Sequence, residues 1–126
     1  MKIITTILTT LETPDDQGND WYGWASNQLS HALIGVVITG VLCFLTDPVI
    51  AFGFLVGYAA SKEFFDLRTK LNLRALRDSL HDILFQTSGS WLAIGLFVPS
   101  AQLFTIAALL GLTLLIDGVV SRIEAK

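Results

Sequence analysis

Long apolar stretches alternate with short polar segments along most of this chain. Residues 21–46 and 83–116 contain no formally charged residue, and a third apolar stretch covers residues 48–61. A hydrocarbon core about 30 Å thick is spanned by roughly 20 residues of α-helix, so the stretch 83–116 is too long for one crossing. Proline disfavours helix at the residue before it, and Pro48 and Pro99 mark two interruptions. The pattern therefore predicts four helices, at residues 22–45, 48–70, 73–98 and 100–123.

The basic residues indicate how these helices lie in a membrane. Cytoplasmic loops of membrane proteins carry an excess of Lys and Arg. If the four helices alternate in direction, all eight basic residues face one side; they are Lys2, Lys62, Arg68, Lys70, Arg74, Arg77, Arg122 and Lys126. We therefore predict an all-α, polytopic membrane protein with four transmembrane helices as two antiparallel hairpins. Both termini are then cytoplasmic, and in a bacterial or phage setting the membrane is the bacterial inner membrane.

Composition agrees with a membrane protein and excludes some partners. Only 15% of the residues are charged, whereas a soluble domain carries about 25%. The net charge of −3 gives no reason to expect a nucleic-acid partner. Residues 21–126 form one predicted four-helix transmembrane domain. The preceding segment, 1–20, is predicted to be interfacial or flexible, because its apolar run is short, rich in Thr and lacks an Ala-x-Ala cleavage site.

Two features suggest partners for these helices. Arg68, Lys70, Arg74 and Arg77 lie between the second and third helices, where they are expected to fix topology and to meet anionic lipid headgroups of the bilayer. A dedicated phosphate-binding site is the alternative. Small residues at positions 53, 57 and 60 lie on one face of the second helix and allow close helix approach, within the chain or in a homo-oligomer. A larger membrane or virion assembly is a further expectation.

The remaining polar residues predict a site at the cytoplasmic ends of the helices. Charged groups within membrane spans are costly and usually mark a function. The predicted topology brings seven such groups to a similar depth: His31, Glu63, Asp66, Asp78, His81, Asp82 and Asp117. Asp78, Asp82 and Gln86 follow one another at steps of four, so they share one inward face of the third helix. Aromatic residues at positions 21, 22 and 24 are expected to mark the membrane interface.

Three interpretations of this polar cluster stay open. The acids can pair with basic residues and only tie helix ends together. They can bind a divalent cation, with His31, Glu63, Asp78 and Asp82 as the candidate ligands, because carboxylates suit Mg²⁺ or Ca²⁺ and imidazole suits Zn²⁺ or Mn²⁺. Acids and basic residues together can hold a polar lipid headgroup, with ligand contacts from His31, Glu63, Asp66, Asp78, Asp82 and Gln86.

The order of these residues resembles the VanZ-like family and the small YfiM-like membrane-associated proteins. The resemblance is carried by Ser30-His31, by the segment 57–66 with Lys62 and Glu63, and by Asp82, Gln86 and Gly89. Gln86 stands where the family has Asn, and the acid–Lys pair that precedes the His in the family is absent here. The resemblance implies a small polytopic protein linked to the cell envelope and does not name a reaction.

From the sequence we expect a membrane protein that binds a cation or an envelope-lipid headgroup at its cytoplasmic face. No arrangement of Ser, His and acid for nucleophilic catalysis is evident, so an enzymatic role is not favoured. The alternative is a phage-encoded membrane protein, either a holin-type lysis protein or a genome-delivery component, because such proteins are small, with few spans and short loops.

Overall fold

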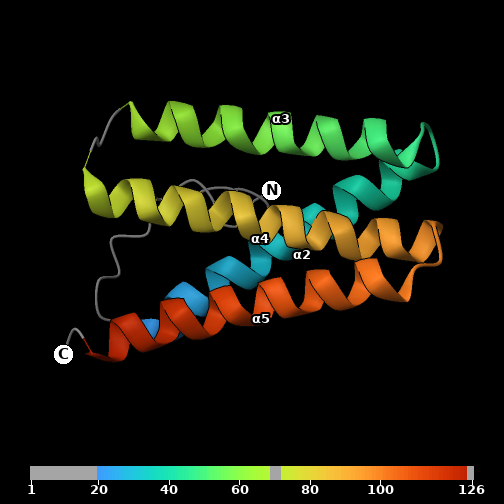
Figure 1. Cartoon of the computed structure of the whole chain (residues 1–126). Helices are drawn as coiled ribbons and strands as arrows, with labels where there is room; N and C mark the ends of the chain where they lie inside the picture. Colours follow the sequence, from blue (N-terminus) through green and yellow to red (C-terminus); the bar gives the residue numbers. More distant parts are fainter. Residues whose placement is uncertain (1–19, 69–71, 125–126) are drawn as a thin grey trace, which may run out of the picture.

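Four α-helices account for nearly all of the residues that the computed structural model describes, 20–68 and 72–124 (Figure 1). They are α2 (Trp21–Cys43), α3 (Pro48–Leu67), α4 (Leu73–Phe97) and α5 (Ala101–Glu124). Successive helices run in opposite directions. The predicted all-helical fold is therefore confirmed, while α2 and α3 end a few residues earlier than the sequence predicts.

The starts of α2, α3 and α4 are fixed by local hydrogen bonds. Asp20, Asp47 and Asn72 each accept a hydrogen bond from backbone N–H groups of the first turn, at donor–acceptor distances of 2.8–3.1 Å. Such N-caps satisfy donors that have no partner within the helix. Pro48 follows Asp47 in the first turn of α3, where its missing N–H costs nothing. These short-range signals explain why the helices begin where they do.

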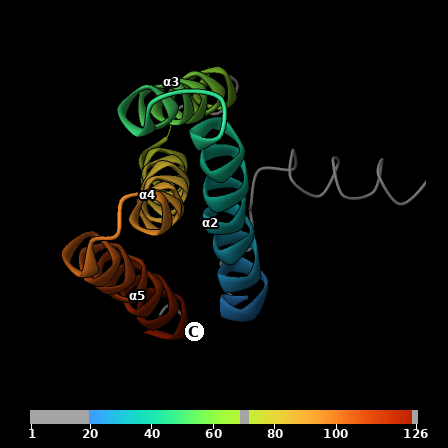
Figure 2. The ribbon, with the colours of Figure 1, turned by 90° about the vertical axis from the view of Figure 1, so that its right-hand side faces the viewer.

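Helix α4 occupies the centre of the arrangement and contacts each of the other three helices, α2 most extensively (Figure 2). The closest approaches of α2 and α4 occur at two glycines. A Cβ atom at Gly35 would collide with the backbone carbonyl of Gln86, and one at Gly89 would collide with that of Ala32. The absence of a side chain at both positions therefore allows the two backbones to meet.

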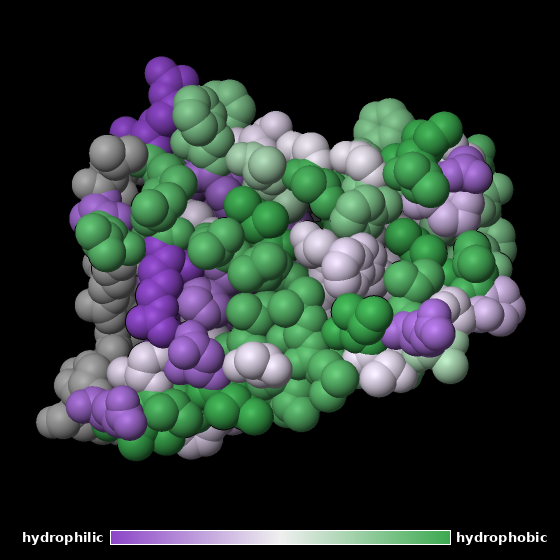
Figure 3. All heavy atoms as spheres, viewed as in Figure 1, coloured by the Kyte–Doolittle hydropathy of each residue, from purple (hydrophilic) through white to green (hydrophobic). Residues whose placement is uncertain are grey.

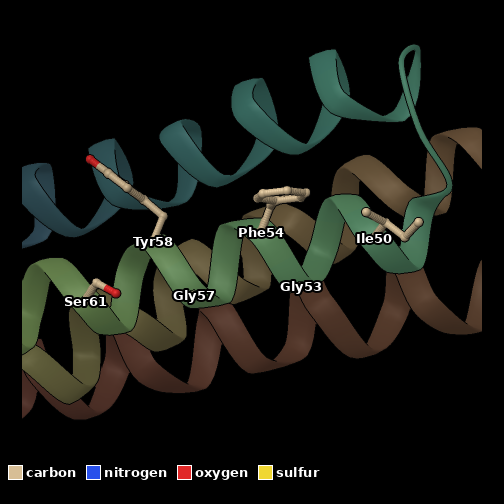
Figure 4. A pocket seen from close by; sticks show the side chains of 6 residues that line it. All are labelled: Ile50, Gly53, Phe54, Gly57, Tyr58 and Ser61. Carbon is tan, nitrogen blue, oxygen red and sulfur yellow. The ribbon is translucent and has the colours of Figure 1, made fainter.

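The small residues at positions 53, 57 and 60 of α3 do not have the packing role within the chain that the sequence suggests. A Cβ atom at Gly53 or Gly57 would meet no other atom within 4 Å, and both glycines are exposed. They lie in an open groove on the outer side of α3, with Ile50, Phe54 and Tyr58 standing along it and Ser61 at one end (Figure 4). The buried face of α3 contains Ala51, Leu55, Ala59 and Glu63 instead.

The outer surface of the helices is largely apolar. Exposed large apolar residues on α2 recur at Leu29, Leu33, Val37 and Val41, and all four helices contribute others. Apolar residues cover the middle of the molecule in Figure 3, while hydrophilic residues gather mainly at the end where α3 leads into α4. Within the described residues two helices, α2 and α5, are long and apolar enough to cross a membrane, and few residues of either apolar stretch are buried.

Candidate functional site: two buried polar layers

The centre of the candidate site is a chain of hydrogen-bonded side chains between α2 and α4. Gln28 Nε2 donates to Asp82 Oδ1 at 2.6 Å, and His31 Nε2 lies 3.4 Å from Asp82 Oδ2. On the other side of the imidazole, Gln86 Nε2 lies 3.2 Å from His31 Nδ1. Gln28, His31 and Gln86 are each exposed by 2% or less. We call these four residues the inner layer.

The hydrogen bonds of the inner layer define its chemistry. When Gln86 Nε2 donates to His31 Nδ1, that nitrogen is unprotonated and the ring proton lies on Nε2, facing Asp82. In this arrangement the amide oxygens of Gln28 and Gln86 are buried and have no hydrogen-bond partner. Buried polar atoms normally have one. The inner layer therefore offers a carboxylate and two unused carbonyl oxygens, which are all acceptors.

Helix α3 adds a second carboxylate beside the inner layer. Glu63 is 3% exposed, and its Oε1 lies 3.0 Å from Lys62 Nζ. The same ammonium group lies 2.8 Å from Asp66 Oδ2, one turn further along the helix. Lys62 and Glu63 are close enough to act electrostatically on Asp82. The buried Glu63 and the partly buried Asp82 thus approach each other, with Lys62 as the nearby cation.

A second group of polar side chains, the outer layer, lies one helical turn closer to the end of the bundle. Arg122 of α5 donates from Nη2 to Asp78 Oδ1 at 2.9 Å, and its guanidinium carbon lies 4.1 Å from the centre of the Trp24 ring. The Trp24 ring fills the space beside Gly118, where a Cβ atom would collide with it. Trp24 also contacts His81 edge to face, with ring centroids 5.7 Å apart.

The outer layer continues into an exposed ion-pair network. Arg77 Nη2 lies 2.9 Å from Asp117 Oδ2, and Asp117 Oδ2 lies 3.5 Å from His81 Nε2. His81 Nδ1 lies 2.8 Å from the backbone carbonyl of Arg77. Both ring nitrogens of His81 therefore face acceptors. Arg77 and Asp117 are more than half exposed, so this network lies at the surface of the bundle.

The structure brings together some of the predicted site residues and separates others. His31, Asp82 and Gln86 share the inner layer, and Glu63 adjoins it. Asp78 belongs to the outer layer, and Asp66 pairs with Lys62. The inward stripe predicted for α4 is confirmed, because Gln86, Gly89 and Ala93 are buried below Asp82.

The predicted metal ligands do not assemble as a metal site. Among the described residues no group of three or more His, Cys, Asp and Glu side chains is placed to hold a metal ion. Of the candidates, Asp78 is engaged by Arg122 and Glu63 by Lys62, which leaves His31 and Asp82 as a pair. Helix rotation explains the difference, since equal depth along a bundle does not bring side chains to the same point.

The structure describes the predicted headgroup-binding residues only in part. Arg77 pairs with Asp117 and contacts Ser121, while Arg68 is exposed at the end of α3. Lys70 and the side chain of Arg74 lie outside the described part of the chain. Among the described basic residues of the outer layer, Arg122 is the buried one, and the sequence marks it as a determinant of topology and as a possible partner of the acids.

Sequence reasoning left two central residues, Trp24 and Gln28, outside the site, and it named Arg122 only among the basic residues that can pair with the acids. Trp24 is expected at the membrane interface, but it is fully buried between α2 and α5. A signal was present: Trp24, Gln28, His31, Gly35 and Thr39 follow one another at steps of three or four along α2, and all five are buried. This spacing defines one helix face, and it would have identified Gln28 as a neighbour of His31.

No family model, curated protein or solved structure matches the chain.

Proposed function

We propose that the chain is an integral membrane protein of four membrane-embedded helices whose inner layer binds a primary ammonium group. The distribution of polarity supports the membrane part of this proposal, because large apolar residues are exposed on every helix while Gln28, His31 and Gln86 are buried. A water-soluble bundle has the opposite pattern, with an apolar core and a polar outer face. The basic residues at the α3–α4 end support a cytoplasmic orientation for that end.

The unpartnered amide oxygens of Gln28 and Gln86 carry the ligand assignment. With Asp82 they form a set of acceptors, and Glu63 adds negative charge nearby. A primary ammonium group has three N–H donors and a positive charge, so it can satisfy both oxygens and the carboxylate together. Hydrogen bonds to charged groups contribute about 1.5–3 kcal/mol each. An amine-bearing lipid headgroup and a free small amine share this chemistry.

The ammonium proposal is tested by melting the purified protein in nanodiscs. Ethanolamine and choline headgroups carry the same charge, but only ethanolamine has N–H donors. We expect phosphatidylethanolamine, or free ethanolamine, to raise the melting temperature relative to phosphatidylcholine and free choline. At a ligand concentration of about 100 Kd the stabilisation is about 2.7 kcal/mol. Whether the lipid or the free amine is effective identifies the source of the ammonium group.

Asp82→Asn is expected to abolish this difference between ethanolamine and choline. The matched control is Asp47→Asn. Asp47 is an exposed N-cap at the end of α3 opposite to Glu63, and Asn caps a helix equally well. Equal melting with both headgroups, or an unchanged response in Asp82→Asn, would show that the inner layer does not bind an ammonium group.

Membrane topology is tested separately by thiol labelling. Cys43 is the only cysteine, so single cysteines introduced in a Cys43→Ala background report one position each. We expect thiols at positions 46 and 100 to react with an impermeant reagent from outside, and a thiol at position 69 to react only after the membrane is opened. External labelling at position 69 would contradict the proposed topology.

A further inference from the structure

The outer layer contains two buried donors without partners. Trp24 is fully buried, and its Nε1 has no hydrogen-bond partner. Arg122 is 9% exposed, and its Nε is likewise buried and unpartnered, although Nη1 and Nη2 bond to the Gly118 carbonyl and to Asp78. The guanidinium group stacks on the indole ring, so both donors belong to one contact between α2 and α5. An unpaired buried donor is costly, and this contact contains two.

The chemistry of these donors defines the missing partner. Indole Nε1 and guanidinium Nε donate and cannot accept, so their partner must be an acceptor. Around them, Arg122 is balanced by Asp78 and Arg77 by Asp117, while His81 faces acceptors with both ring nitrogens. A contact that offers two unpaired donors, one of them on a guanidinium group, suits an anion, and Arg is especially suited to phosphate oxygens.

The donors lie next to the inner layer in a defined order. Trp24 and Gln28 are four residues apart on the buried face of α2, so the two layers are separated by about 5.4 Å, one helical turn. Trp24 lies in the first turn of α2 and Arg122 in the last turn of α5, so the outer layer is nearer the end of the bundle. The exposed Arg77–Asp117 pair lies beside it. A ligand that enters from this end meets the donors first and the acceptors second.

We infer that the two layers together bind a small phosphorylated primary amine, with its ammonium group in the inner layer and its phosphate on Trp24 Nε1 and Arg122 Nε. This inference rests on the proposed function for the amine end, while the phosphate end rests on the unpaired donors. The order of the layers favours a soluble molecule over a bilayer lipid. In a phospholipid the phosphate is on the acyl-chain side of the amine, whereas here the ammonium group lies deeper in the bundle than the phosphate.

The inference is tested by titrating the detergent-solubilised full chain with phosphoethanolamine, ethanolamine, phosphocholine and inorganic phosphate, using calorimetry. We expect phosphoethanolamine to bind about tenfold to a hundredfold more tightly than ethanolamine, because a hydrogen bond to a charged group contributes about 1.5–3 kcal/mol. We expect inorganic phosphate to compete with phosphoethanolamine. If a short-chain phosphatidylethanolamine binds more tightly than phosphoethanolamine, the preference for a soluble ligand is wrong.

Trp24→Phe is the decisive variant, because it removes the N–H donor and keeps an aromatic ring, although it loses the part of the indole that lies against Gly118. We expect it to weaken phosphoethanolamine binding about tenfold and to leave ethanolamine binding within about twofold. Trp91→Phe is the matched control, since Trp91 stacks on Phe52 away from this layer. If Trp24→Phe does not fold, Arg122→Lys is the second variant, because it keeps the charge and lacks Nε. We expect it to reduce the affinity advantage of phosphoethanolamine over ethanolamine by the same factor.

The two proposals fail in different ways. If ethanolamine binds, but phosphoethanolamine binds no more tightly and Trp24→Phe changes nothing, the phosphate site is wrong and the ammonium site stands. If phosphocholine binds as tightly as phosphoethanolamine and Asp82→Asn has no effect, the ammonium site is wrong. The phosphorylated amine is then also wrong as the ligand, although a Trp24-dependent response to phosphate would leave an anion site.

Discussion

The interior of this bundle contains many polar side chains and its outer surface is largely apolar. A water-soluble protein has the reverse arrangement. On the outside of α5, Ile106, Leu109, Leu112 and Ile116 are about half exposed. Buried polar or charged side chains occur on all four helices: Gln28, His31, Thr39, Glu63, Ser79, His81, Gln86, Ser88, Ser90 and Arg122. Many of them bond across helices, for example Thr39 to Ser90 at 2.7 Å.

This difference indicates what holds the helices together. Apolar burial drives the association of helices in water, but lipid tails are as apolar as leucine, so it provides no such force in the proposed bilayer. Close backbone contact at small residues and hydrogen bonds between helices then become the main attractions. The contacts of Gly35 and Gly89, the Thr39–Ser90 bond and the inner layer are all of these kinds.

The largest effect is expected from adding a methyl group between α2 and α4. Gly35→Ala and Gly89→Ala each place a Cβ against a backbone carbonyl, which cannot move aside as a side chain can. Overpacking usually costs about 1–3 kcal/mol, and we expect at least the upper value here. Denaturant unfolding in detergent, followed by circular dichroism, measures it. Gly53→Ala and Gly57→Ala enter open space and should change stability by less than about 0.5 kcal/mol. If the Gly53 and Gly57 variants lost as much stability as the Gly35 and Gly89 variants, the contacts between α2 and α4 would be contradicted.

A charge on the outer surface tests whether that surface meets lipid. Leu112 lies near the centre of α5 and is 54% exposed. Leu112→Arg is expected to raise the apparent free energy of insertion by about 3 kcal/mol, measured by the inserted fraction in microsomes. Ile123→Arg, at an equally exposed position near the end of α5, is the control and should insert normally. Efficient insertion of both variants would argue against a lipid-facing α5.

Coupling between Glu63 and Asp82 tests whether α3 belongs to the site. Glu63 and Asp82 interact electrostatically across the α3–α4 contact. The effects of Glu63→Ala and Asp82→Ala on unfolding free energy should therefore be non-additive by about 0.5–3 kcal/mol. Glu63→Ala combined with Asp117→Ala is the comparison, because Asp117 bonds to Arg77 and His81 instead, and it should be additive. If the changes in unfolding free energy add in both double variants, Glu63 does not interact with the inner layer.

The smallest effect is expected from the hydroxyl pair in the middle of the bundle. Thr39→Val and Ser90→Ala remove a buried hydrogen bond between α2 and α4. Such bonds in membrane proteins contribute about 0.6 kcal/mol on average and up to about 1.7. A double-mutant cycle on unfolding measures the coupling. Thr113→Val serves as the control, because its hydroxyl bonds only to the Leu109 carbonyl of its own helix. Zero coupling between Thr39 and Ser90 would contradict the bond.

The number and order of the helices could be predicted because local signals determine them. Apolar length indicates each helix, while Pro48 marks a start that the structure confirms, and the third helix begins at residue 73 as predicted. The inward stripe of α4 could also be predicted, since Asp82, Gln86 and Gly89 share a face by spacing alone. Four membrane crossings stay a prediction, because only α2 and α5 among the described helices have the length and composition of a span.

The composition of the site could be predicted only in part, because it depends on how the helices rotate against one another. His31 and Asp82 were both identified, yet their direct contact depends on the Gly35 and Gly89 approaches that set α2 against α4. Trp24 resembles an interfacial anchor by position, although its spacing from Gln28 and His31 places it on the buried face of α2. Its partner on α5, Gly118, depends on a long-range contact, which the spacing along α2 does not identify.

The central position of α4 has a consequence for the assembly of the protein in the cell. This helix carries Arg77, Asp78 and Asp82, and their partners lie on helices made both earlier and later. Gln28 and His31 of α2 are available when α4 leaves the ribosome, but Arg122 and Asp117 arrive only with the last helix. In the proposed membrane, α4 is therefore only partly paired until α5 has been synthesised, and the last helix completes the pairing of Asp78 and Arg77.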